Sequence, residues 1–330
     1  MSTQAATPLA WPAVPLIAWE DTKDTLHMWT QIVGKIRLEL MPMMNHWWQV
    51  PLYVSARGLT TSVMPYGDRG LEMEFDFHRH VLQITTTEGQ ARAVRLEPRS
   101  VADFYAETMA RLAEVDMAVK IVARPSEVAV AIPFADDQEH HSYDARYARL
   151  FWQSLVQADR VFTDFKSGFV GKASPVNFWW GAFDLASGRF SGREAPLHPG
   201  GVPNCPDWVI QEAYSHEVSN HGYWPGAGDE GAFYAYTYPA PPGYAGWPVQ
   251  PEAAYYDPAW SEFLLPYQAV RAAEDPDGLL LTFLQSTYEA GAELGAWDRR
   301  ALERPAPGSR SRSAGTPPAR PGRRSDRRLR

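Results

Sequence analysis

The chain has 330 residues, of which 45% are hydrophobic and 21% charged, a composition typical of a globular protein with one large domain or two smaller ones. Its one cysteine, Cys205, excludes an intrachain disulfide and a zinc site built from cysteines. The N-terminal stretch lacks a basic region, and no apolar run approaches the ~18 residues of a membrane span. We therefore expect a cytoplasmic protein without a signal peptide or membrane anchor.

The charge is divided unevenly along the chain. Residues 299–330 hold eleven Arg, no Lys and two acidic residues, and the rest of the chain holds 20 basic and 37 acidic residues. An acidic body is a poor surface for nucleic acid, because phosphate binding requires basic side chains. The tail is rich in Pro, Gly, Ser and Arg, so we predict that it is disordered. A nucleic-acid-binding or self-docking role of the tail stays open.

The first half reads as a helix, a run of strands and a second helix. Apolar residues at helical spacing predict a helix over 21–41, capped by Asp21 or Thr22. A second helix over 99–115 begins with Ser100 as its cap, and a strand is expected at 117–122. Short links between successive strands favour antiparallel pairing. The predicted strands between the two helices are 47–55, 59–65, 71–78, 81–87 and 91–97.

The second half repeats this order with longer loops. A polar, acidic link at 132–144 precedes an amphipathic helix over 143–166. A strand and a turn are predicted within 174–190, a strand at 233–239, and a helix over 277–298.

Two segments of the halves resemble each other. NHWWQVPLYVSAR at 45–57 aligns without gaps on NFWWGAFDLASGR at 177–189, with five identities that include two tryptophans. We therefore predict an α+β fold of two related halves, each an antiparallel sheet with amphipathic helices packed on it. Chance similarity of two tryptophan-rich strands is the alternative. The expected organisation is an N-terminal extension at 1–15, halves at 16–135 and 136–298, and the tail at 299–330.

The stretch AYSHEVSNHGYWPG at 213–226 nearly spells the zinc motif H-E-x-x-H, with one extra residue between the histidines. Residues five apart on a helix are rotated by about 140°, so His216 and His221 cannot chelate one ion from one helix. Asn220-His221-Gly222 is typical of a turn. We predict no metal site, although a loop site that adds His198 stays open. His216 and Glu217 remain candidates for catalysis, since a glutamate buried beside a histidine can act as a base.

Aromatic residues concentrate in one region, with 18 of them among residues 174–260. Together with scattered polar groups they are typical of the walls of a small-molecule pocket. The alternative is that they form a core and a cover over the sheet. The candidate ligand-binding residues are Asn177, Trp179, Asp184, Arg189, His198 and Trp224.

Several stretches together resemble a known family. GKASPVNFWWGAFDLASGRFSGREAP, HPGGVPNCPD, EAYSHEVSNHGYWPG, FYAYTYP and FLLPYQAVRAAEDPDGLLLTFLQSTYEA are similar to uncharacterised bacterial proteins grouped as domain of unknown function 5996, over residues 11–298. This resemblance implies a soluble bacterial protein, and it supplies no activity, cofactor or catalytic residue. We expect a small-molecule-binding protein with its pocket in the second half. A hydrolase-like enzyme that uses His216 and Glu217, and a protein-interaction module, are the alternatives.

Overall fold

A computed structural model describes residues 11–304 and shows two antiparallel sheets of six strands each, with helices packed on them. The predicted α+β class and the antiparallel pairing are confirmed. Every helix in this span is too short or too polar to cross a bilayer.

The first sheet, here called sheet 1, is formed by the N-terminal half. Its strand order is β1-β2-β4-β5-β6, and β3 also pairs with β4. Trp29 of helix α1 stacks on Phe104 of helix α2 at 4.5 Å between ring centroids, and Phe104 also faces Phe75 of β4. The core of this half therefore lies between its helices and the sheet. The elements are α1 (Glu20–Leu40), β1 (Tyr53–Val54), β2 (Gly58–Thr60), β3 (Met64–Tyr66), β4 (Arg69–Asp76), β5 (Val81–Thr86), β6 (Ala91–Arg95) and α2 (Val101–Ala113).

Helix α1 follows the predicted apolar spacing, since Leu26, Trp29, Val33 and Ile36 are all buried. Its cap differs from the prediction, because Trp19 precedes the first turn. The nearby threonines bind a distant segment instead. Thr22 Oγ1 accepts a hydrogen bond from the backbone of Asp144, and Thr25 Oγ1 accepts one from Ser142. The predicted Ser100 cap of α2 is confirmed by a 3.1 Å hydrogen bond from the backbone N–H of Asp103.

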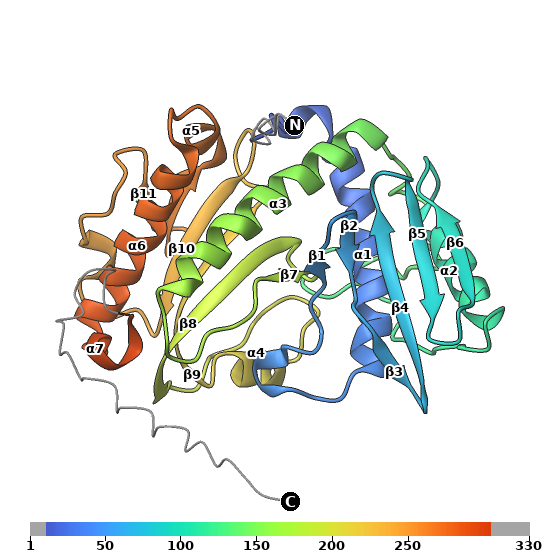
Figure 1. Ribbon diagram of the computed structural model, residues 1–330, viewed down its shortest axis with the longest axis horizontal. Coiled ribbons are helices and arrows are strands. Elements are labelled where there is room, and N and C mark those ends of the chain that lie inside the picture. Colours follow the sequence, from blue (N-terminus) through green and yellow to red (C-terminus); the bar gives the residue numbers. More distant parts are fainter. Residues whose placement is uncertain (1–10, 305–330) are drawn as a thin grey trace, which may run out of the picture.

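The C-terminal half forms sheet 2, with the strand order β11-β12-β10-β9-β8-β7. Figure 1 shows α3 and α6 side by side across one face of this sheet. Phe162 of α3 packs on Phe233 of β10, and Phe165 packs on His221 of β9. The elements are α3 (Ala145–Ser167), β7 (Asn177–Trp179), β8 (Asp184–Glu194), α4 (Asp207–Ala213), β9 (His216–Trp224), β10 (Ala232–Tyr238), β11 (Tyr255–Asp257), β12 (Glu262–Pro266), α5 (Tyr267–Arg271), α6 (Pro276–Leu294) and α7 (Arg299–Leu302).

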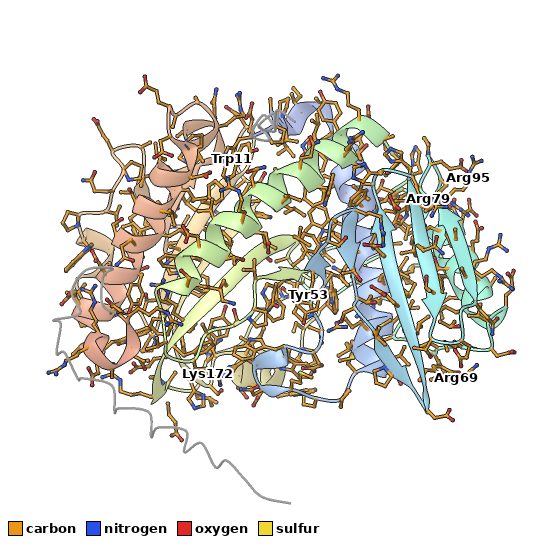
Figure 2. All side chains as sticks on the ribbon, viewed as in Figure 1. Trp11, Tyr53, Arg69, Arg79, Arg95 and Lys172 are labelled. Carbon is orange, nitrogen blue, oxygen red and sulfur yellow. The ribbon has the colours of Figure 1, made fainter. Side chains whose placement is uncertain are left out.

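The two sheets meet edge to edge beside Tyr53, which Figure 2 places between them. The backbone of Leu52 donates to Phe178 O at 3.0 Å and accepts from the Phe178 N–H at 2.8 Å. Trp180 crosses the same boundary. Its indole N–H donates to Val50 O at 2.9 Å, and its ring covers Gly34 of α1.

Both ends of the described chain pack on the second half. Trp11, labelled in Figure 2, contacts the rings of Phe233 and Tyr267, although it belongs to the predicted N-terminal extension. Helix α7 extends the ordered chain beyond residue 298, where the tail was expected to begin, and Arg299 pairs with acidic residues of α6. The remainder of the predicted tail, 305–330, lies outside the described residues, as do residues 1–10.

The predicted strand at 117–122 is wrong. This segment has no regular structure, and the backbone that follows it is bound by a side chain of α1 rather than by a neighbouring strand. Gln31 Nε2 donates to Ser126 O at 2.7 Å, and the Ser126 N–H donates to Gln31 Oε1 at 2.9 Å. The chain at Ser126 is thereby fixed against α1.

The structure does not show the internal repeat. Asn45–Trp47 forms a 3₁₀ turn in which His46 and Trp47 have left-handed backbones with φ of 56° and 61°, whereas the aligned Asn177–Trp179 is strand β7. The halves share only the coarse order of helix, antiparallel strands and helix. The tryptophan pairs therefore match in sequence but have different backbone conformations.

Gly34 provides a test of the contact between the halves. A Cβ built there lies 2.4 Å from the Trp180 ring. We expect Gly34→Ala to lower the free energy of unfolding by about 1–3 kcal/mol through overpacking, against the gain of about 1 kcal/mol that alanine brings to a helix interior. Urea denaturation measures the change. In a Trp180→Leu background the same substitution should cost less, and an equal cost in both backgrounds would contradict the assignment.

Candidate functional site

A large cavity lies on the face of sheet 2 opposite α3 and α6. Its volume is about 1540 Å³, above the ~300–1,000 Å³ of typical small-molecule pockets. Both halves contribute to its wall, through α1, the 3₁₀ turn η2 (Asn45–Trp47), residues 122–128, and the strands and loops of sheet 2. Seven of the 13 tryptophans line it: Trp47, Trp48, Trp179, Trp180, Trp208, Trp224 and Trp260.

Strand alternation produces the floor of the cavity. Successive side chains of a strand point to opposite faces, so Tyr234, Tyr236 and Tyr238 of β10 line the cavity, while Phe233 and Ala235 are buried in the core. The rings of Tyr234 and Tyr236 stack with centroids 6.1 Å apart. The sequence FYAYTYP therefore gives sheet 2 one apolar face and one face of tyrosines.

Asp184 is the buried polar centre of this floor. It begins β8, is 6% exposed, and accepts a hydrogen bond from the Tyr234 hydroxyl. The Tyr234 ring reaches it by lying over Gly222 of β9, where a Cβ would come within 2.2 Å of the ring. Burial raises the pKa of Asp184 to about 7, the hydrogen bond from Tyr234 opposes this rise, and the charge of Glu127 adds to it.

Glu262 is a second carboxyl group of the cavity. It starts β12, directly after a hairpin in which Asp257 Oδ1 accepts from the backbone N–H groups of Ala259 and Trp260. Burial raises the pKa of Glu262 to about 7, and the charge of Asp184 raises it further, so the two carboxyl groups interact. Trp260 from the same hairpin packs edge-on against Trp224 at 5.1 Å.

A group of aromatic and polar side chains continues the wall beside these carboxyls. The hydroxyls of Tyr214 and Tyr236 share a hydrogen bond, and Asn220 Nδ2 donates to Tyr236 at 2.9 Å. Burial raises the pKa of Tyr214 to about 12. His198 stacks on Tyr214 at 4.8 Å and contacts Tyr238 at 4.9 Å. These contacts hold the imidazole at the edge of the tyrosine face.

A pair of opposite charges also lines the cavity, contributed by α1 and the irregular segment that follows α2. Lys35 donates to Ser126 Oγ at 2.9 Å, and burial lowers its pKa while the charge of Glu127 raises it. Burial raises the pKa of Glu127, and the charge of Lys35 lowers it. The Glu127 carboxylate packs on Gly181, where a Cβ would lie 2.1 Å from Oε1. Each group of this pair thus faces an opposite charge.

The turn that carries His46 and Trp47 has a strained backbone, since non-glycine residues seldom adopt positive φ. His46 is held by its neighbours. Its Nδ1 lies 2.9 Å from Ala213 O, its Nε2 lies 2.8 Å from Lys172 Nζ, and its ring packs on Phe190. Figure 2 shows Lys172 at the lower end of sheet 2. Burial lowers the pKa of His46, so the ring is neutral near pH 7.

Four of the residues proposed from the sequence for ligand binding lie on this cavity: Trp179, Asp184, His198 and Trp224. The other two lie elsewhere. Asn177 is fully buried, and neither atom of its amide has a hydrogen-bond partner within residues 11–304. Arg189 is buried on the helix-facing side of sheet 2, where it donates to Phe165 O and covers the Phe165 and Tyr288 rings.

The two candidate catalytic residues are not brought together on the large cavity. Glu217 accepts hydrogen bonds from Arg193 at 2.6 Å and Ser191 at 2.8 Å, and it borders a separate cavity of about 290 Å³. His216 lies at the start of β9, with its ring 5.5 Å from that of His46. The Glu217 carboxylate is therefore occupied by Arg193 and Ser191.

The predicted turn at His221 is wrong, because the residue lies in the middle of β9 and pairs with Ala235 and Ser187. Its ring packs on Phe165, away from the cavity that His198 lines. Burial lowers the pKa of His221 to about 3. In the part of the chain that the structure describes, no three His, Cys, Asp or Glu side chains are grouped as metal ligands. The G-x-G-x-x-G spacing at 226–231 lies in the β9–β10 hairpin, without the following helix of a dinucleotide site.

Sequence analysis missed several cavity residues. The tyrosines of β10 could have been predicted, because they alternate strictly in the sequence and therefore lie on one face of a strand. Glu262 and Glu127 had none, because both follow irregular turns whose course depends on distant contacts. Contributions from the first half, such as Trp47 and Lys35, were likewise not expected in a pocket assigned to the second half.

The family described as a family of unknown function (DUF5996) matches residues 11–304. The chain belongs to this family. No curated protein and no solved structure matches the chain. The region matched by DUF5996 includes every residue that lines the large cavity.

Asp184 should make stability depend on pH. Its pKa is raised from 3.8 to about 7 in the folded protein, so its protonation favours folding at low pH, and this contribution is lost as the pH rises toward 7. We expect the free energy of unfolding to fall between pH 5 and 8 by about 2–3 kcal/mol more in the wild type than in Asp184→Asn, at about 1.4 kcal/mol per pKa unit. Urea denaturation at several pH values measures this difference. Parallel pH profiles would show that the carboxyl group is not desolvated.

Gly222 should be required for the contact between Tyr234 and Asp184. Gly222→Ala places a Cβ against the tyrosine ring, so we expect a loss of about 1–3 kcal/mol in the free energy of unfolding. Gly246→Ala is the matched control, since a Cβ there meets nothing within 4 Å. Equal melting temperatures for the two variants would count against the arrangement described.

Proposed function

We propose that this protein binds a small organic molecule in the large cavity of sheet 2. The observation that carries the proposal is a hollow of about 1540 Å³ whose wall combines seven tryptophans, the β10 tyrosines and a few polar groups. Ligand pockets have this composition, because aromatic surface supplies affinity and a small number of polar groups fix orientation.

The burial of Asp184 supports a binding role. A carboxyl group at 6% exposure is costly to bury, and its one side-chain partner, Tyr234, is itself held over a glycine. A core needs no such arrangement, whereas a binding site benefits from polar groups fixed in advance. The same reasoning applies to the strained turn at His46 and Trp47, since strain concentrates at functional sites.

The two alternative functions have less support. A hydrolase that uses His216 and Glu217 lacks a free base, because Arg193 and Ser191 both bind the Glu217 carboxylate. An interaction module would be favoured by exposed aromatic surface, and Trp208 and Trp260 are 59% and 57% exposed. Both of these tryptophans line the cavity, so a ligand site accounts for their exposure.

A library of small metabolite-like compounds, screened by thermal shift and tryptophan fluorescence, tests the proposal. Seven tryptophans line the cavity, so a bound molecule should change the emission. For compounds that bind, we expect Trp179→Ala to raise the dissociation constant about tenfold, or about 1.4 kcal/mol, since it removes one wall. Trp247→Ala, outside the cavity, should leave the constant unchanged within about twofold.

Two outcomes would contradict the proposal. One is a library in which no compound raises the melting temperature. The other is a set of ligands whose affinity changes equally in Trp179→Ala and Trp247→Ala, which would place the binding site elsewhere.

A further inference from the structure

We propose that the molecule bound in this cavity is an organic cation, an amine or a quaternary ammonium compound, whose charge lies beside Asp184 and Glu262. This inference rests on the proposed function and adds the chemical class of the ligand. It is carried by the cavity, by the balance of charge around it, and by the aromatic faces next to the two carboxyl groups.

Among the described residues, Asp184 and Glu262 have no basic partner, and Arg124, which also lines the cavity, donates to the backbone oxygen of Ala131 rather than to either of them. Lys23 pairs with Asp24 at 2.6 Å, and the charges of Lys35 and Glu127 act on each other. Within the described chain, the side chains that act on Asp184 and Glu262 are acidic residues and Tyr234, and none is basic. No basic side chain of residues 11–304 therefore balances either carboxyl group, and a cationic ligand would supply the missing positive charge.

The aromatic side chains beside these carboxyl groups also favour a cation. The face of an aromatic ring is negative, so an ammonium group within about 6 Å of it is attracted, most strongly by tryptophan. Trp224 and Trp260 pack together on the wall that also holds Glu262. Tyr234 lies over Gly222 and donates to Asp184. An anion in the same place would meet the negative ring faces and two acidic groups.

Binding of a cation should be linked to the release of protons. The pKa values of Asp184 and Glu262 are about 7, so both groups are partly protonated near neutral pH. A cation favours the ionised forms, and below pH 7 it must displace protons. Its affinity should therefore increase from pH 6 to pH 8, by up to about tenfold per pH unit for each proton released, whereas that of a neutral ligand should not.

Three probes of matched shape test the inference on the full chain. They are 1-naphthylmethylamine, 1-naphthalenemethanol and 1-naphthoate, which are cationic, neutral and anionic at pH 8. We expect calorimetric titration to give a dissociation constant for the amine at least about tenfold below that of the alcohol, with the weakest binding for the naphthoate. The amine alone should bind more tightly at pH 8 than at pH 6.

Isosteric variants locate the charge. Glu262→Gln removes a charge with little change in shape. It should raise the dissociation constant of the amine about tenfold and change that of the alcohol by less than about twofold. Glu252→Gln, at an exposed position outside the cavity, is the matched control and should leave both unchanged. Asp184→Asn serves as the second variant if Glu262→Gln does not fold.

The outcomes separate this inference from the proposed function. An alcohol that binds as tightly as the amine overturns the cationic class and leaves small-molecule binding in place. Failure of the amine to bind, or an equal effect of Glu262→Gln and Glu252→Gln on it, also overturns the inference. The proposed function fails if the wider library gives no ligand, or if Trp179→Ala and Trp247→Ala change the affinity of its ligands equally.

Discussion

The edge contact between the two sheets fixes the position of everything else in this protein. Two backbone hydrogen bonds join Leu52 to Phe178, and the Trp180 indole spans the same boundary to reach α1. Because the sheets meet at their edges rather than face to face, one face of sheet 2 is left uncovered by its own helices α3 and α6. The first half then supplies the missing wall through α1, the η2 turn and residues 122–128.

The cavity contains two largely buried carboxyl groups, and burial raises the pKa of both. Tyr234 stabilises the ionised form of Asp184 through its hydrogen bond, but burial and the charge of Glu127 act in the opposite direction and raise the pKa. For Glu262, burial and the charges of Asp184 and Asp257 all raise the pKa. Two carboxyl groups poised near pH 7 are sensitive to any charge that enters the cavity, which is the property expected of a site rather than of a core.

Sequence reasoning succeeded where structure depends on local periodicity. The helices α1, α2, α3 and α6 and the strands β4, β5 and β6 follow from apolar spacing, and the Ser100 cap follows from its own side chain. The predicted strand at 47–55 is a strand only at Tyr53–Val54, and the predicted strand at 59–65 is divided into β2 and β3. Sequence reasoning failed where distant contacts decide. The segment at 117–122 is apolar enough for a strand, but Gln31 binds the backbone that follows it. His221 has turn-forming neighbours, but β8 and β10 pair on either side of it.

The candidate site was predictable to a similar degree and for the same reason. Four residues chosen from the aromatic-rich region, Trp179, Asp184, His198 and Trp224, line the cavity, and their role in ligand binding stays a prediction. His216 and Glu217 were considered together because they are adjacent in the sequence, but Glu217 borders the smaller cavity and is paired with Arg193. In a strand, adjacent residues point to opposite faces, so two polar neighbours in sequence seldom share a site. Residues two apart do share a face, and this rule places Tyr234, Tyr236 and Tyr238 together on the wall of the cavity.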